Sequence, residues 1–288
     1  MGVLFEMGMA RRPTLLDNAA QRATFGPQTI RTRLMLQKNA CLLVIGNEIL
    51  SGRTQDANTR VLARALNAQG IRLLEVRVIP DIEDHIIRTV TECRERFDVI
   101  FTCGGIGPTH DDITAECIAK AMGVPLLRHE PTFQKLETIM GKEKFNAARQ
   151  RMAMLPEGAT PIENAISAAP GFSIGNVHVM AGVPSIFAAM VDSLVPQMEK
   201  GPPLTSVSWH AAGLKEGDFA DDLRRLQEQF PGIDLGSYPY GLTNGTTGTA
   251  LVAKGYDASA VKSAGSLLHD LIMAHGREPI SGDPPHKA

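Results

Sequence analysis

The sequence predicts an α/β protein in two parts, of which the first is a three-layer α/β/α domain with a mostly parallel sheet. Short apolar runs alternate with amphipathic helical segments over the first part of the chain, a pattern typical of a parallel sheet covered on both faces. The run Gly201-Pro202-Pro203 is the strongest linker signal. After it the order becomes strand, helix, strand, strand, helix, which predicts a second, small α+β domain.

The first domain is expected over residues 39–201. Its strands are recognised as compact apolar runs, and its helices by apolar residues that recur on one side and by stop signals such as Gly70. In chain order we expect strand 41–45, helix 57–69, strand 73–79, helix 82–96, strand 99–103, helix 115–122, helical segments 131–140 and 143–154, a hairpin of 172–174 and 177–180, and helix 185–198.

The second domain is expected over residues 204–276, with strand 206–211, helix 216–230, strands 233–238 and 248–253, and helix 258–274. The proline-containing tail 277–288 is expected to be loose. Residues 1–38 carry more basic than acidic side chains and no sustained periodicity. They are interpreted as a disordered extension without a fold, with an arginine-rich transit peptide as the alternative.

The bulk composition describes an ordinary globular protein. The 288 residues are 43% hydrophobic and 21% charged, with a formal net charge of −2, so electrostatics favour neither nucleic acid nor an acidic membrane surface as a partner. No apolar run reaches the roughly 18 to 20 residues that span a bilayer. The four cysteines form no C-x-x-C pair, which suits reduced thiols and predicts a cytoplasmic location.

The most informative segment is the glycine loop, residues 104–114, with the sequence GGIGPTHDDIT. It lies between an expected strand and an expected helix, where backbone N–H groups and a helix N-terminus can surround a phosphate. It is not a Walker A loop, because no Gly-Lys-Ser/Thr follows, and His110 breaks the dinucleotide pattern. The simpler interpretation is a tight turn in which Asp112 caps the helix.

Acidic and amide side chains follow three consecutive expected strands. The carboxyl ends of parallel strands share one edge of the sheet, where ligands bind, so these side chains are candidates for one site. Crowded carboxylates repel one another unless a cation bridges them, and oxygen ligands favour Mg²⁺ or Mn²⁺. The candidate metal ligands are Glu48, Asp56, Asp112 and Glu116, and the candidate catalytic residues are Asp81, Asp111 and Asp112.

The remaining candidates are ligand- or phosphate-binding positions. Two small-residue segments, 164–172 and 181–185, would let a ligand approach the backbone closely, although the second also fits an ordinary helix start. The candidates are Gly104, Gly105, Ile106, Gly107, Pro108, Thr109, Thr114, Asn47, Gly52, Asn58, Pro170, Gly171, Gly182 and Pro184, with His110 as a further loop residue.

At these residues the chain resembles the molybdopterin-binding domain superfamily. It is most similar to the competence/damage-inducible protein A (CinA) branch and to the N-terminal domain of eukaryotic FAD synthases. The matching segments are IGNEILSG with Asp56 and Asn58, VIPD, GGIGPTHDDIT with Glu116, SAAPGF and AGVP, and GSYPYG with GTALVAKG in the second domain. The family's usual PGVP and GTE stand here as AGVP and GNE, and neither change removes a carboxylate.

The resemblance implies the molybdopterin-binding fold, a frequent homo-oligomeric state, and Asp81 with Asp112 as the functional pair. In relatives of this kind the domain is associated with hydrolysis of ADP-ribose-like pyrophosphates or of FAD, in the presence of a divalent metal (Mg, Mn or Co) and potassium. The deamidase and nucleotidyltransferase domains found in some relatives have no counterpart in this sequence, so their activities are not implied.

Three functions therefore remain open. The chain is interpreted first as a metal-dependent hydrolase of a nucleotide pyrophosphate, second as a molybdopterin-binding protein of molybdenum cofactor metabolism, and third as a non-catalytic nucleotide-binding module. All three take a phosphorylated small molecule as the partner, and none predicts binding to nucleic acid or to a membrane. The sequence contains no residue set that identifies the ring of the ligand.

Overall fold

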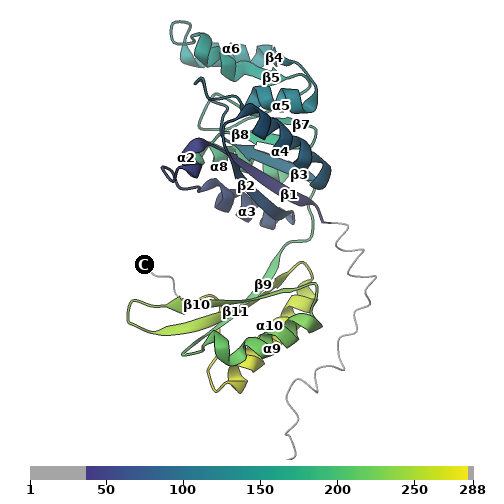
Figure 1. Cartoon of the computed structure of the whole chain (residues 1–288), viewed down its shortest axis with the longest axis vertical. Helices are drawn as coiled ribbons and strands as arrows, with labels where there is room; N and C mark the ends of the chain where they lie inside the picture. Colours follow the sequence, from purple (N-terminus) through teal and green to yellow (C-terminus); the bar gives the residue numbers. More distant parts are fainter. Residues whose placement is uncertain (1–36, 285–288) are drawn as a thin grey trace, which may run out of the picture. The chain divides into compact units, whose positions relative to one another are not determined.

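The computed structural model describes residues 37–284, and its folded elements are shown in Figure 1. Residues 1–36, which are interpreted as a disordered extension or a transit peptide, lie outside the described residues. Residues 285–288, the end of the predicted loose tail, also lie outside them. Gln37 and Lys38 already belong to the first domain, because Gln37 is buried and the Lys38 Nζ lies 2.8 Å from a carboxylate oxygen of Glu199.

The first domain is built on a six-stranded sheet in the order β2-β1-β3-β8-β7-β6. Strands β2 (Arg72–Ile79), β1 (Asn39–Ile45), β3 (Val99–Cys103) and β8 (Val177–Met180) are parallel. The last two strands, β7 (Gly171–Ile174) and β6 (Thr160–Ile162), are antiparallel additions. The predicted mostly parallel sheet is confirmed, and Gly175-Asn176 forms the predicted turn between β7 and β8.

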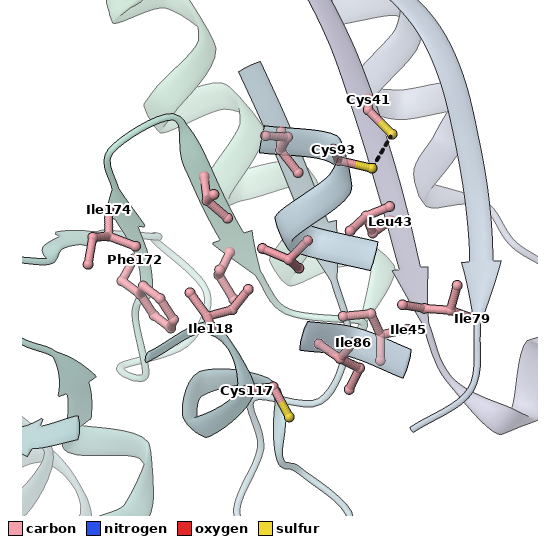
Figure 2. Packing of buried hydrophobic residues seen from close by; sticks show 14 of the residues in the cluster. Cys41, Leu43, Ile45, Ile79, Ile86, Cys93, Cys117, Ile118, Phe172 and Ile174 are labelled. Atoms are coloured by element: carbon pink, nitrogen blue, oxygen red, sulfur yellow. Dashed lines mark hydrogen bonds between the residues drawn. The ribbon is translucent and has the colours of Figure 1, made fainter. Parts of the chain in front are cut away.

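Helices cover this sheet on two sides, and strand β1 explains why. Its Leu42 and Val44 pack with α3 (Asn58–Gln69) and α8 (Pro184–Leu194), while its Leu43 and Ile45 pack with α4 (Glu83–Arg96) and α5 (Thr114–Met122). Figure 2 shows the α4 and α5 side of this core. A strand that buries both faces must be apolar where it is covered, and β1 is apolar and buried from Ala40 to Ile45.

Strand β2 differs, because it lies at the edge of the sheet. On it Leu74, Val76 and Val78 are 47%, 38% and 39% exposed, and they alternate with the partly buried Glu75 and Arg77. The expectation of strands covered on both faces is therefore wrong for β2. The sequence carries a signal of this difference, because Glu75 and Arg77 interrupt the apolar run of β2, whereas β1 contains no charged residue.

The predicted helix 143–154 is also wrong. The short helix α7 (Ala147–Gln150) begins only after Asn146, whose side chain accepts a hydrogen bond from the Arg149 N–H. A 3₁₀ turn follows (Arg151–Ala153), and Met154 already begins strand β5 (Met154–Pro156), paired with β4 (Leu126–Arg128). The preceding helix α6 (Glu130–Met140) agrees with its prediction and ends at Gly141 with φ +79°.

Two smaller features complete the first domain. A short helix, α2 (Asn47–Leu50), follows β1 where only a loop is predicted. Helix α8 ends at Leu194 and continues as a 3₁₀ turn, Val195–Gln197. Pro196 explains this early end, because proline has no N–H for the next helical hydrogen bond.

The second domain has the predicted β-α-β-β-α order. It consists of β9 (Thr205–Ala212), α9 (Glu216–Gln229), β10 (Asp234–Gly241), β11 (Thr247–Gly255) and α10 (Ala258–Ala274), with a sheet in the order β10-β11-β9-β12. The tail predicted to be loose instead contributes β12 (Ile280–Ser281), which pairs with β9. The His210 Nδ1 lies 2.9 Å from the Gly282 carbonyl oxygen, which fixes this end further.

Within residues 37–284, no helix has the combination of length and apolar character that a membrane span requires. The protein's cysteines, Cys41, Cys93, Cys103 and Cys117, are all free and buried. The Sγ atoms of Cys41 and Cys93 lie 3.9 Å apart between β1 and α4, where Figure 2 marks their contact.

Candidate functional site

The loops after β1, β2 and β3 meet at one edge of the sheet, where the strand order reverses around β1. The Gly46 N–H donates to the Ile79 carbonyl at 3.1 Å, and the Asn47 N–H donates to an Asp81 carboxylate oxygen at 2.8 Å. Asp81 therefore lies at the N-terminus of α2. The predicted grouping of strand-end residues is correct here, because the register of β1 and β2 brings their ends together.

The start of the glycine loop fits tightly against β1 and α5. Gly104 has φ +107°, and a Cβ placed on it would lie 2.1 Å from the Ile45 carbonyl oxygen. Gly105 has φ +66°, and its Cβ would lie 2.2 Å from the Thr114 Oγ1. Only glycine meets both requirements. The Thr114 N–H donates to the Gly105 carbonyl at 3.0 Å and closes the loop across the start of the helix.

Several backbone donors of the loop are left for a ligand. None of the hydrogen bonds within residues 37–284 uses the N–H of Gly105, Ile106 or Gly107, and Pro108 has none to offer. The Thr114 side chain is completely buried beside them, and its Oγ1 has no partner in the described part of the chain. Free backbone donors at the start of a helix are the arrangement that binds phosphate in many α/β proteins.

Asp112 does not cap helix α5. The helix N-cap is Ile113, without a side-chain hydrogen bond, and the Asp112 Oδ2 instead accepts hydrogen bonds from the Thr109 N–H, at 2.8 Å, and from the Thr109 hydroxyl. The carboxylate thus turns back into the loop, where a Cβ on Gly107 would lie 2.7 Å from Oδ2. The capping interpretation is wrong because Thr109 offers this carboxylate a nearer pair of donors.

Asp111 and His110 are placed differently from Asp112. Their side chains are 64% and 97% exposed, and the His110 Nδ1 lies 3.9 Å from the Asp111 Oδ1. Of the two adjacent aspartates, Asp112 therefore has its carboxylate within the loop, whereas Asp111 has its carboxylate at the surface.

A second wall of the site comes from α3 and from the loop after β8. The Asp56 Oδ1 accepts the N–H groups of Asn58, at 2.9 Å, and Thr59, at 3.3 Å. The Asn58 side-chain amide donates to the Gly182 carbonyl at 2.8 Å. A Cβ on Gly182 would lie 3.3 Å from the Gly104 Cα, so this wall lies against the start of the glycine loop.

Burial raises the pKa of Cys103 to about 12, and the negative charges of Asp56 and Glu48 contribute to the increase. Glu48 is itself exposed, and its carboxylate oxygens lie 2.6 Å from the position that a Cβ on Gly46 would occupy.

The four predicted metal ligands are not assembled into one centre. Glu116 forms an ion pair with Lys120 at 3.0 Å, while Asp112 and Asp56 are engaged by their own loops. Across residues 37–284, no three His, Cys, Asp or Glu side chains lie close enough together to hold a metal. This donor set does not fit a resident metal held by protein ligands alone. It leaves room for Mg²⁺ bound through one or two carboxylates and the substrate's phosphates.

A pocket of about 80 Å³ lies beside the glycine loop. It is lined by Gly105, Ile106, Gly107, Asp112, Ala115, Glu116, Leu126, Arg151, Met152, Met154, Leu155, Pro170 and Phe172. An apolar cavity that holds benzene has a volume of about 150 Å³, so a two-ring group would lie at the mouth of this pocket rather than inside it.

The other predicted ligand positions have mixed roles. Pro170 lines the pocket, whereas Gly171 allows β7 to approach β8, since its Cβ would lie 2.2 Å from the Val179 carbonyl oxygen. Pro184 is the first residue of α8 and is exposed. Gly52 has φ +73° in an exposed turn with open space around it, and the structure gives it no contact with the other candidates.

Sequence reasoning missed Arg151. Its Nη1 donates to the Thr109 carbonyl and its Nη2 to the Asp112 carbonyl, both at 3.1 Å, from the 3₁₀ turn before β5. Arg149 and Arg151 stand in one polar stretch predicted as helix. No signal in that stretch separates them, because the position of Arg151 depends on how residues 124–160 return to the loop.

These features define a three-layer α/β domain with a phosphate-type loop and carboxylates at the carboxyl edge of its sheet. Residues 41–200 match the family model described as probable molybdopterin binding domain, and residues 210–278 match that of the FAD synthase middle domain. The chain belongs to the molybdopterin-binding-domain family, in its CinA-like branch. The resemblance of the sequence motifs is thereby confirmed.

Individual relatives agree. A protein of Archaeoglobus fulgidus is 31% identical over 202 residues, which cover 69% of this chain and 84% of that protein. A CinA-like protein of Desulfovibrio desulfuricans is 31% identical over 195 residues, 65% of this chain and 46% of that protein. The crystal structure of CinA from Thermoplasma acidophilum has a TM-score of 0.52 and 32% identity, and the match covers 55% of this chain and 96% of that chain.

Proposed function

We propose that this protein is a divalent-metal-dependent hydrolase of a nucleotide pyrophosphate of the ADP-ribose or FAD type. One observation carries the proposal. The Asp112 carboxylate is held inside the same loop that offers the free N–H groups of Gly105, Ile106 and Gly107. A proton acceptor and a phosphate cradle therefore share one short segment of backbone, an arrangement suited to hydrolysis of a phosphoanhydride.

In this proposal the free N–H groups and the α5 N-terminus bind one phosphate of the substrate. The Oδ2 of Asp112 is occupied by Thr109, which leaves Oδ1 facing its surroundings without a partner among the described residues. Asp112 takes a proton from the attacking water as the water oxygen bonds to phosphorus. The bond from that phosphorus to the bridging oxygen breaks, and the second phosphoryl group leaves with that oxygen.

The metal enters this scheme with the substrate. Glu116 lines the same pocket as Asp112 and, once it exchanges Lys120 for a cation, would hold that cation together with phosphate oxygens. A divalent cation bound there would polarise the phosphoryl oxygens. Asp81 acts indirectly, because its bond to the Asn47 N–H fixes the loop after β1. Potassium remains part of the proposal only through the family resemblance.

The test is direct. Purified full-length protein is incubated with ADP-ribose or FAD and with Mg²⁺, Mn²⁺ or Co²⁺, and the released AMP is measured by chromatography. The proposal expects turnover by the wild type. Turnover no greater than that of an Asp112→Ala variant with any of these metals would reject it.

Two alternatives are kept as further proposals. The matched family model is described as a probable molybdopterin binding domain, which favours a role in molybdenum cofactor metabolism. Tight molybdopterin binding without pyrophosphate hydrolysis would establish that role. A non-catalytic nucleotide-binding module would instead bind nucleotide undiminished after loss of both Asp81 and Asp112, with no product formed.

We further propose that the chain forms a homo-oligomer in the cytoplasm. The four free, buried thiols support a reducing compartment, and the exposed apolar side chains of edge strand β2 support association. Light scattering coupled to size-exclusion chromatography measures the oligomeric state, and a monomer at micromolar concentration would contradict that part of the proposal.

A further inference from the structure

Arg151 connects two parts of the first domain that are distant in the sequence. The guanidinium donates to the carbonyls of Thr109 and Asp112, the two residues whose mutual hydrogen bond holds the Asp112 carboxylate in the loop. Each Nη atom serves one carbonyl, so the planar fork of the arginine spans the segment from 109 to 112. A lysine, with its single nitrogen, could not hold both carbonyls in the same way.

The surroundings of Arg151 show why its charge matters. Arg151 is the basic residue among those that line the pocket, and Asp112 and Glu116 are the acidic ones. Glu116 is already paired with Lys120 at the surface. The loop contains no lysine that could approach a phosphate, so a side-chain cation at this site has to come from another segment.

We propose that Arg151 is the positioning residue of the glycine loop and also the cation that contacts the substrate's phosphate. The two N–H groups used on Thr109 and Asp112 fix the loop, and the remaining N–H groups of the guanidinium are available to the anion. The first role follows from the contacts alone. The second role rests on the proposed function, since it requires a phosphate in the loop.

In this proposal residues 124–160, the segment between α5 and β6, have the role of bringing Arg151 to the glycine loop. This stretch carries β4, α6, α7, the 3₁₀ turn and β5, and it adds no strand to the main sheet. Its path returns Arg151 to the loop that precedes α5. The glycine loop and the segment 124–160 then form one binding surface, although the glycine loop itself ends at Thr114.

The experiment compares full-length wild type with Arg151→Ala, Arg151→Lys and the matched control Arg149→Ala. Arg149 lies two positions away, is partly buried, and bonds to the Lys144 carbonyl instead of the glycine loop. Hydrogen exchange of the amides of residues 104–114 is measured without ligand. Binding of inorganic pyrophosphate with Mg²⁺ is measured by calorimetry at low and at high salt, and thermal unfolding verifies that each variant is folded.

The proposal expects faster amide exchange in residues 104–114 of Arg151→Ala, and pyrophosphate binding weakened by about 10- to 100-fold, the range for a lost hydrogen bond to a charged group. The salt dependence of binding should also diminish in this variant. Arg151→Lys should recover most of the binding and its salt dependence, with only part of the loop protection. Arg149→Ala should behave as the wild type does.

The two roles fail in different ways. Amide exchange equal in Arg151→Ala and Arg149→Ala would overturn the positioning role. Pyrophosphate binding unchanged in Arg151→Ala, or absent from the wild type, would overturn the phosphate contact. If the wild type binds pyrophosphate but hydrolyses neither ADP-ribose nor FAD, the proposed hydrolase activity is rejected while the role of Arg151 stands.

Discussion

The side-chain amide of Asn58 donates a 2.8 Å hydrogen bond to the carbonyl oxygen of Gly182, 124 residues further along the chain. Asn58 is only 5% exposed, whereas Gly182 is at the surface, so this partly buried bond ties the start of α3 to the loop before α8. It holds the second wall of the site, formed by α3 and the loop after β8, against the glycine loop.

Replacing Asn58 with alanine should lower the free energy of unfolding by about 1–3 kcal/mol, because a donor is lost from a carbonyl that accepts no other hydrogen bond within residues 37–284. Asn67, on the same helix and more exposed, is the matched control, and Asn67→Ala should change stability by less than about 0.5 kcal/mol. Urea unfolding measures both. Equal losses of unfolding free energy in the two variants would show that the hydrogen bond from Asn58 to Gly182 does not itself stabilise the fold.

Gly104→Ala should destabilise the first domain by more than about 3 kcal/mol. The new Cβ would lie 2.1 Å from the Ile45 carbonyl oxygen at a φ of +107°, so a clash adds to the roughly 1–2 kcal/mol cost of left-handed backbone. Gly52→Ala shares the positive φ but has open space around it, and should cost only about 1–2 kcal/mol. Urea unfolding of both variants separates the clash from the backbone cost, and similar losses would contradict the tight fit.

The unfolding free energy should decrease as the pH falls from about 6.5 to about 4. Burial lowers the pKa of His178 on β8 from 6.5 to about 4, so in this window the unfolded chain binds a proton that the folded chain excludes. Stability therefore rises with pH through the window, by an amount on the order of a few kcal/mol. His178→Gln should flatten this part of the profile measured by urea unfolding. His110→Gln, at a fully exposed side chain, should leave it unchanged, and an unaltered slope in His178→Gln would disprove the assignment.

The two adjacent aspartates should differ in activity. Asp112→Asn should reduce hydrolysis of ADP-ribose by at least about 100-fold, the lower range for general base catalysis, because its carboxylate lies inside the loop. Asp111→Asn should stay within a few-fold of the wild type, since its side chain is largely exposed. Initial rates at saturating substrate measure both. A larger loss from Asp111→Asn would reverse the assignment.

Much of the fold could be predicted because its long elements carry strong patterns. The buried β1 run and the helix that ends at Gly70 are unambiguous in the sequence, and both are confirmed. Apart from the exposed face of edge strand β2, most failures involve short elements. Strands β4, β5, β6 and β12 contain two or three residues each, which is too few for a period-two pattern to appear. Their pairing depends on the tertiary path.

The candidate site was predictable in composition but not in orientation. The sequence located the loop and the strand-end carboxylates, because the topology of a parallel sheet brings them to one edge. It could not show that Thr109 turns Asp112 inward, that Lys120 engages Glu116, or that Arg151 reaches the loop from residues 124–160. These outcomes depend on side-chain rotamers and on chain paths, which residue spacing does not determine.

The contact between Gly104 and the Ile45 carbonyl also limits how this gene can change. Every other amino acid carries a Cβ, so any missense mutation at the Gly104 codon introduces the same clash, however conservative it is chemically. Neutral drift cannot begin at this codon without a prior shift of β1, and β1 is fixed by the layers on both of its faces. We therefore expect glycine here across the descendants of this gene that keep the fold, whichever ligand they have come to bind.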